Sequence, residues 1–261
     1  MFLAYLFVFL LGLTVGSFLN AVIYRLSKGE SALKGRSYCP HCRHPLAWYD
    51  LIPLISFLML QGKCRYCKKP ISWQYPLIEI STALIFLQIS NQFSNLPITQ
   101  VIFLLAISSF LIVLFVYDLK HYILPDKILL PAIGIVALYN FGFWISDSFG
   151  IPTPPTSALL SALGAAGFFL FIFLVSRGSA MGFGDVKLAF LMGLFLGWPN
   201  ILVALFTAFL SGAIVGIILI LLKKKGMKSE VPFGPFLISG TFFALFWGAD
   251  MVQWYKTVSG W

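Results

Sequence analysis

Long apolar runs separated by short polar or charged loops dominate the chain. Eight runs suit membrane-spanning helices: Phe2–Ile23, Pro76–Ser90, Thr99–Val116, Ile128–Ile145, Ser157–Ser176, Val186–Leu196, Ile201–Leu222 and Phe233–Gly248. An apolar helix needs about 20 residues to cross the hydrocarbon core. The second and sixth runs are shorter than this, so the pattern predicts about eight transmembrane helices. Trp198-Pro199-Asn200 is a turn signal that separates the sixth run from the seventh.

The amino-acid composition also indicates a membrane protein. Of the 261 residues, 59% are hydrophobic and 10% are charged, whereas soluble domains carry roughly 25% charged residues. Mean hydropathy is +0.92. The net charge of +9 could suggest a nucleic-acid partner, but the basic residues lie in short loops between apolar runs, which is typical of topology signals. We therefore expect an all-α polytopic membrane protein in a lipid bilayer, with no nucleic-acid partner.

The positions of Lys and Arg predict how the spans are oriented. With the N-terminus outside, 17 of the 18 basic residues fall in cytoplasmic loops, and only Lys256 lies on the opposite side. Positive residues near span ends show this bias toward the cytoplasm. The first run has no basic residue ahead of its apolar core, unlike a signal peptide, so we interpret it as an uncleaved span.

Three parts follow from this topology: a first transmembrane helix over residues 1–24, a cytoplasmic segment over residues 25–75, and a seven-helix membrane core over residues 76–261. The cytoplasmic segment contains the four cysteines of the chain in two Cys-x-x-Cys pairs, Cys39, Cys42, Cys64 and Cys67. Two such pairs match a tetrathiolate zinc site. Two disulfides are the alternative, but stable disulfides are rare in the cytoplasm. We expect a structural zinc ion, because a segment this small needs a staple.

Acidic residues at span ends are the strongest candidates for function, because an ionisable group near hydrocarbon is costly. Asp118 ends the third run and Asp185 precedes the sixth, which places both at cytoplasmic ends of spans. Two carboxylates brought together share a proton, as an aspartic protease requires. Gly182 and Gly184 would allow close approach of the backbone. Three further acids stand out: Glu79, Asp126 and Asp250.

Structural roles compete with a catalytic pair. Asp126 follows Pro125 and precedes an apolar run, so we expect it to be a helix N-cap. Asp185 could likewise cap a helix that starts at Val186. Asp118 could pair with a basic neighbour, either Lys120 or Lys127. From the residues alone, these alternatives stay open.

Several motifs follow one another along the chain: Gly16-Ser-Phe-Leu-Asn20, Ala21-Val-Ile-Tyr-Arg25, the two cysteine pairs, Tyr75-Pro-Leu-Ile-Glu79, Asp118 through Pro125-Asp126, and Gly182-Phe-Gly-Asp185. In this combination the chain resembles the bacterial type IV prepilin peptidases over nearly its full length. In that family, the first aspartate of Asp-x6-Pro-Asp and the aspartate of Gly-x-Gly-Asp are the catalytic pair. The resemblance therefore implies that Asp118 and Asp185 are catalytic. It leaves four supporting motif residues: Gly182, Gly184, Pro125 and Asp126.

The resemblance also implies an activity and a location. The protein would be a membrane-embedded aspartic endopeptidase of the bacterial cytoplasmic membrane. Its substrates would be type IV prepilins or pseudopilins, cleaved after a glycine at the cytoplasmic face. Family members usually then methylate the new N-terminal residue with S-adenosylmethionine. The sequence contains no G-x-G-x-x-G fingerprint that would mark the methyl-donor site.

Two other functions compete with this one. A presenilin-like intramembrane protease also uses a Gly-x-Gly-Asp aspartate, but the cysteine segment and Pro125-Asp126 favour the prepilin branch. A proton- or cation-coupled transporter would use carboxylates as relays. Transporters often contain two repeats with broken helices at matched positions, and the two halves of this chain show no obvious repeat.

Overall fold

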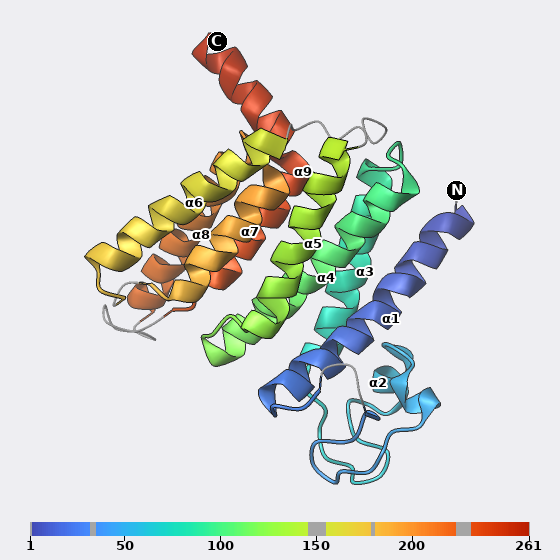
Figure 1. Ribbon diagram of the computed structural model, residues 1–261. Helices are drawn as coiled ribbons and strands as arrows, with labels where there is room; N and C mark the ends of the chain where they lie inside the picture. The colour runs from blue at the N-terminus through green and yellow to red at the C-terminus, as the bar shows by residue number, and fades with distance from the viewer. Residues whose placement is uncertain (1, 32–34, 146–154, 179–180, 223–230, 261) are drawn as a thin grey trace. The chain divides into compact units, whose positions relative to one another are not determined.

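The computed structural model describes residues 2–31, 35–145, 155–178, 181–222 and 231–260 (Figure 1). Within them the chain is helical and forms no strand, which confirms the all-α prediction. The long helices are α1 (Phe2–Ser27), α3 (Gln74–Gln92), α4 (Ile98–His121), α5 (Asp126–Ile145), α6 (Pro155–Val175), α7 (Phe183–Leu196), α8 (Asn200–Leu221) and α9 (Gly234–Ser259). Between α1 and α3 lie a 3-10 turn, η1 (Trp48–Leu51), and a short helix, α2 (Ile55–Met59).

Each long helix overlaps one of the apolar runs. Five of them, α1, α4, α6, α8 and α9, are long and apolar enough to cross a membrane, so the protein is a multi-pass membrane protein. Helix α7 has 14 residues and is roughly 21 Å long, which is shorter than the hydrocarbon core. Five lysines that entered the orientation argument lie outside the described residues: Lys34, Lys223, Lys224, Lys225 and Lys228.

Several helix boundaries differ from the apolar runs, and two of these differences bear on Asp118 and Asp185. Helix α4 continues past Val116, so Asp118 lies in its last turns. Helix α7 begins at Phe183, with Gly182 as its N-cap. The backbone N–H of Asp185 donates to the carbonyl of Gly182 at 3.1 Å. Asp185 is therefore inside the first turn, and the alternative that it caps a helix starting at Val186 is wrong.

The chain divides into two compact units, residues 1–113 and 114–261. In the first unit, α1 packs along α3. A Cβ atom on Gly12 would lie 2.5 Å from Cα of Ala83, and one on Gly16 would lie 2.7 Å from Cα of Glu79. These pairings show that the helices are antiparallel. The two glycines, four residues apart, allow the backbones to approach closely.

In the second unit, α7 occupies the central position. It packs against α5, α6 and α9, and α8 packs along α9 (Figure 1). Most residues of α7 are buried, including Leu188, Leu191 and Met192. A helix that is apolar on all sides belongs in a protein interior. Glycines again permit the close contacts, because Gly193 lies against the backbone of Ala162 and Gly240 against that of Ala204. Asp185 is thus carried by the most enclosed helix of this unit.

Candidate active site

The side chain of Asp118 is buried at the end of α4. The residue is 4% exposed, and a carboxylate removed from water needs hydrogen-bond donors. One donor is the backbone N–H of Gly234, the first residue of α9. A Cβ atom on Gly234 would lie 2.5 Å from Oδ2 of Asp118. Helix α9 therefore begins directly against this carboxylate.

Asp185 is also buried and lies close enough to Asp118 for their charges to interact. It is 9% exposed, its carboxylate accepts a hydrogen bond from the backbone N–H of Gly182, and it experiences the charge of Asp118. The described residues form two ion pairs, Arg65–Asp50 and Lys187–Asp126, and neither includes these aspartates. The alternative that Asp118 pairs with Lys120 or Lys127 is therefore not what the structure contains. The two buried carboxylates interact electrostatically with each other, and neither has a cationic partner among the described residues.

Leu124, in the turn between α4 and α5, packs against the first turns of α7 and α9. A Cβ atom on Gly184 would lie 3.2 Å from Cβ of Leu124, and one on Gly234 would lie 3.5 Å from its Cδ2. Leu124 is 8% exposed. Gly184 is thus small because an apolar side chain occupies the space beside it. Sequence reasoning missed both Leu124 and Gly234, although a Gly-Pro pair at the start of a helix is a recognisable signal.

Asp126 has a different role from the one expected. Helix α5 begins at Asp126, and the carbonyl of Pro125 accepts the N–H groups of Ile128 and Leu129. Pro125 therefore holds the boundary position, and the N-cap prediction for Asp126 is wrong. The carboxylate of Asp126 instead binds Nζ of Lys187 at 2.7 and 2.9 Å. This pair ties the start of α5 to the first turns of α7, next to Asp185.

The four cysteines form a second candidate site, in the first unit. Their Sγ atoms all lie within 4.8 Å of one another, and those of Cys39 and Cys67 are 3.9 Å apart. Four sulfurs at about 2.3 Å from a tetrahedral metal would be separated by roughly 3.8 Å. All four cysteines are free thiols. The cluster therefore fits a metal ion, and its spacing needs only a small contraction.

The two cysteine pairs are built alike. In the first pair, the N–H of Cys39 donates to the carbonyl of His44, and the N–H of Arg43 donates to the carbonyl of Cys39. In the second pair, the N–H of Cys64 donates to the carbonyl of Lys69, and the N–H of Lys68 donates to the carbonyl of Cys64. Arg43 and Lys68 both have positive φ, 58° and 59°. Burial opposes ionisation of Cys39, but hydrogen bonds from the backbone N–H groups of Cys42 and His41 and from the thiols of Cys64 and Cys42 lower its pKa to about 7. A thiolate is the form that binds metal.

A buried aspartate joins the segment around the cysteines. The side chain of Asp50 is 3% exposed and accepts a hydrogen bond from Arg65 Nε at 2.7 Å. Tyr66 Oη donates to it at 3.0 Å and the Ala47 N–H at 3.2 Å. Burial alone would raise the pKa of Asp50, but the bonds from Arg65, Ala47 and Tyr66 hold it below its usual value. Because Arg65 and Tyr66 separate Cys64 from Cys67, Asp50 braces the second cysteine pair.

Glu79 anchors the same segment to the α1–α3 pair. It is 5% exposed, and its Oε2 accepts the backbone N–H of Leu54 at 2.9 Å. The hydroxyl of Ser17, on α1, also bonds to it. One turn away, Asn20 Nδ2 donates to the carbonyl of Tyr75 at 3.1 Å. Two of the motif stretches noted in the sequence thus meet in one buried polar cluster.

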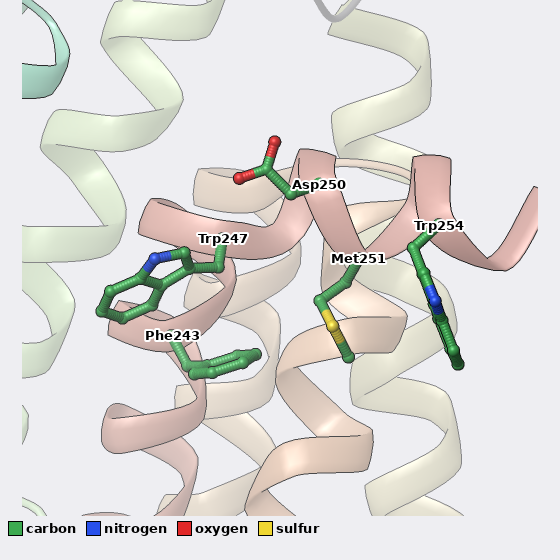
Figure 2. Close-up of a pocket in the computed structure, with 5 residues that line it drawn as sticks. All are labelled: Phe243, Trp247, Asp250, Met251 and Trp254. Carbon is green, nitrogen blue, oxygen red and sulfur yellow. The ribbon is translucent and has the colours of Figure 1, made fainter.

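A shallow groove of about 380 Å³ lies on the later part of α9. Its lining residues are Phe243, Trp247, Asp250, Met251 and Trp254 (Figure 2). The carboxylate of Asp250 points away from the rings in Figure 2. Phe243, the lining residue nearest to Gly234 along α9, is nine residues beyond it, or roughly 14 Å. The groove is therefore separate from the pair of buried carboxylates.

Comparison with known proteins places both candidate sites in matched regions. The profile of the Bacterial Peptidase A24 N-terminal domain matches residues 10–93, and that of the Type IV leader peptidase family matches residues 105–217. The chain is 34% identical to the Prepilin leader peptidase/N-methyltransferase of Aeromonas hydrophila, with 96% of this chain and 93% of the relative covered.

Two further relatives carry the same name. The one from Pseudomonas aeruginosa is 32% identical, with 96% of this chain and 93% of the relative covered. The one from Myxococcus xanthus is 39% identical, with 86% of this chain and 66% of the relative covered. No solved structure matches the chain significantly.

Proposed function

The chain belongs to the type IV leader peptidase family, and we propose that it is a membrane-embedded aspartic endopeptidase that cleaves type IV prepilins or pseudopilins. The substrate class comes from the relatives' name, and cleavage after a glycine of the leader comes from the resemblance. One observation carries the proposal: Asp118 and Asp185 are buried, sense each other's charge, and have no cationic partner among the described residues. A structural role such as a surface ion pair would not leave them so.

We propose Asp118 and Asp185 as the catalytic pair. Like charges at close range do not both ionise, so one carboxylate is ionised and its partner is protonated. The ionised carboxylate takes a proton from water as the water oxygen attacks the scissile carbonyl carbon, and the protonated carboxyl gives its proton to the carbonyl oxygen. When the tetrahedral intermediate collapses, the C–N bond breaks. The proton held by the first carboxylate passes to the leaving amine, and the second carboxylate takes a proton from one hydroxyl of the intermediate. The acid product forms, and the pair returns to its starting protonation state.

The supporting motif residues would hold this pair in place. Gly182 donates its N–H to Asp185, and Gly184 leaves space for Leu124. Pro125 and Asp126 begin α5, which the Lys187 ion pair ties to α7.

Isosteric substitution of the two aspartates tests the catalytic assignment. Asp118→Asn and Asp185→Asn should each reduce cleavage of a co-expressed prepilin to background, while the protein remains inserted and folded. Asp250→Asn is the matched control, because Asp250 is exposed, and it should cleave like the wild type. Near wild-type processing by either buried-site variant would show that the pair is not catalytic.

We propose that the cysteine cluster binds a structural zinc ion through Cys39, Cys42, Cys64 and Cys67. Its support is the sulfur spacing and the twin cysteine turns described above. When bound, zinc would hold the two turns together. Cys39→Ser should release the metal and loosen the segment, with less effect on cleavage. His41→Gln is the control and should keep one zinc per chain by elemental analysis. Purified wild-type protein without zinc, or a Cys39–Cys42 disulfide in cells, would contradict this assignment.

We also propose that the enzyme methylates the new N-terminal residue with S-adenosylmethionine. The relatives' name includes N-methyltransferase, and the methyl donor and the methylated residue come from the resemblance. No residue in the described part of the chain is assigned to the methyl donor. Mass measurement of the processed N-terminus, after co-expression with a prepilin, reports both steps. Loss of the leader together with the mass of one methyl group is the expected result. A cleaved but unmethylated product would limit the enzyme to proteolysis, and an intact precursor would contradict both activities.

We propose that the protein lies in the bacterial cytoplasmic membrane with its N-terminus outside. The support is the distribution of Lys and Arg, which puts the cysteine segment and both aspartates on the cytoplasmic side. Reporter fusions after α3 and after α4 test the orientation. The first should report outside and the second cytoplasm, and the reverse pattern would invert the topology.

A further inference from the structure

The first turn of α9 offers one backbone donor to its surroundings. Pro235 has no N–H, and the N–H groups of Phe236 and Leu237 both bond to the carbonyl of Phe233. The N–H at the first position of a helix has no partner within that helix. In α9 this N–H belongs to Gly234, and it is directed to the carboxylate of Asp118.

The absence of a side chain on Gly234 also leaves room for the carboxylate of Asp118. A Cβ atom there would lie 2.5 Å from Oδ2 and 3.1 Å from Cγ of Asp118. Real Cβ atoms do not approach so closely, so an alanine at this position would displace the carboxylate. Pro235 restricts the backbone at the start of the helix, which limits how far Gly234 can withdraw.

Another glycine of α9 has a different neighbour. A Cβ atom on Gly240 would collide with the backbone carbonyl of Ala204 on α8, so Gly240 serves helix packing. Gly234 instead collides with the end of a side chain. That side chain can rotate away, so substitution of Gly234 should disturb the position of Asp118 more than the fold.

We infer that Gly234 is a positioning residue for Asp118: its N–H orients the carboxylate, and its missing side chain leaves that carboxylate room. The inference rests on the proposed function, in which Asp118 is one of the catalytic pair. It assigns the start of α9 as the third wall of the active site, beside the ends of α4 and α7. It also accounts for the Gly-Pro pair that opens the last helix.

Three glycine variants separate positioning from packing. Gly234→Ala should lower kcat for prepilin cleavage about 100-fold, because a displacement near 1 Å is enough for such a loss, and should leave KM and Tm close to wild type. Gly240→Ala should lower Tm by several degrees, while the folded protein keeps its kcat. Gly216→Ala, on α8, is the neutral control, because a Cβ atom there meets nothing within 4 Å. A Gly234→Ala enzyme with a kcat within twofold of wild type would overturn the inference.

If Gly234→Ala does lower Tm, a double-mutant cycle with Asp118→Ala tests whether the loss comes from the collision with Asp118. If the collision is with Asp118, Gly234→Ala should cost stability only while Asp118 is present, so its effect on Tm should vanish in the Asp118→Ala background. Equal losses in both backgrounds would overturn the inference. Asp118→Asn distinguishes failure of the catalytic assignment from failure of the positioning role of Gly234. An active Asp118→Asn enzyme removes the proposed catalytic pair, whereas an inactive one beside a fully active Gly234→Ala enzyme removes only the role of Gly234.

Discussion

Glu79 makes the sharpest prediction about the first unit. Replacing it by alanine removes the acceptor for the Leu54 N–H, which bonds to Oε2 at 2.9 Å, and the partner of the Ser17 hydroxyl. An unsatisfied buried N–H costs about 1–3 kcal/mol, and truncation of a 5% exposed side chain adds a cavity. We expect Glu79→Ala to destabilise attachment of the cysteine segment by about 2–4 kcal/mol.

This free energy corresponds to a large change in how often the segment opens. Because 1.4 kcal/mol is a factor of ten, the open population should rise about 30- to 700-fold. Transfer of zinc to a colorimetric chelator, followed in detergent-solubilised protein, measures that opening. Glu79→Gln is the matched control: its amide oxygen still accepts the Leu54 N–H in a side chain of the same length, so zinc release should stay within a few-fold of wild type.

The comparison between the two variants decides the outcome. Equal rates of zinc release from Glu79→Gln and Glu79→Ala would mean that the hydrogen bond to Leu54 does not hold the segment. Equal rates from Glu79→Ala and wild type would refute the anchoring role altogether. Prepilin cleavage, measured in parallel, should change far less than zinc release in either variant, because Glu79 lies in the first unit and Asp118 and Asp185 lie in the second.

Three further predictions concern other contacts. Gly184→Ala should lower cleavage, because its Cβ would lie 3.2 Å from Cβ of Leu124, and adding Leu124→Ala should restore activity; a double variant no better than the single one would argue against that contact. Asp126→Asn should lower the free energy of unfolding by no more than about 1 kcal/mol, because the ion pair between Asp126 and Lys187 is partly exposed. A larger loss, measured by thermal unfolding, would contradict this expectation. Asp50→Asn should speed zinc release. Since the Asp50 pKa is below its usual value, its stabilisation is complete above the unfolded pKa near 3.9 and is lost only as pH falls through the folded pKa. The ratio of the zinc-release rate of Asp50→Asn to that of the wild type should therefore be constant from pH 8 to pH 5. A ratio that falls to one within this range would contradict an ionised Asp50.

The sequence by itself determined the features that depend on local pattern. Apolar runs follow from the need to bury every backbone polar group in lipid, so the helices and the all-α class could be predicted. The four cysteines could be grouped, because two Cys-x-x-Cys pairs in one short segment match the ligand spacing of a metal site. Burial cost also singled out Asp118 and Asp185, whose catalytic role stays a prediction.

Only the tertiary structure decided which distant residues meet. Asp126 binds Lys187, 61 residues away, although its local context predicted an N-cap. Gly234 reaches Asp118 from the start of the last helix, and Glu79 finds its partner in Leu54. Such contacts depend on how whole helices pack, and no periodicity or short motif encodes them. The sequence could therefore name the two aspartates, but only the packed structure shows that a backbone N–H, an apolar side chain and an ion pair surround them.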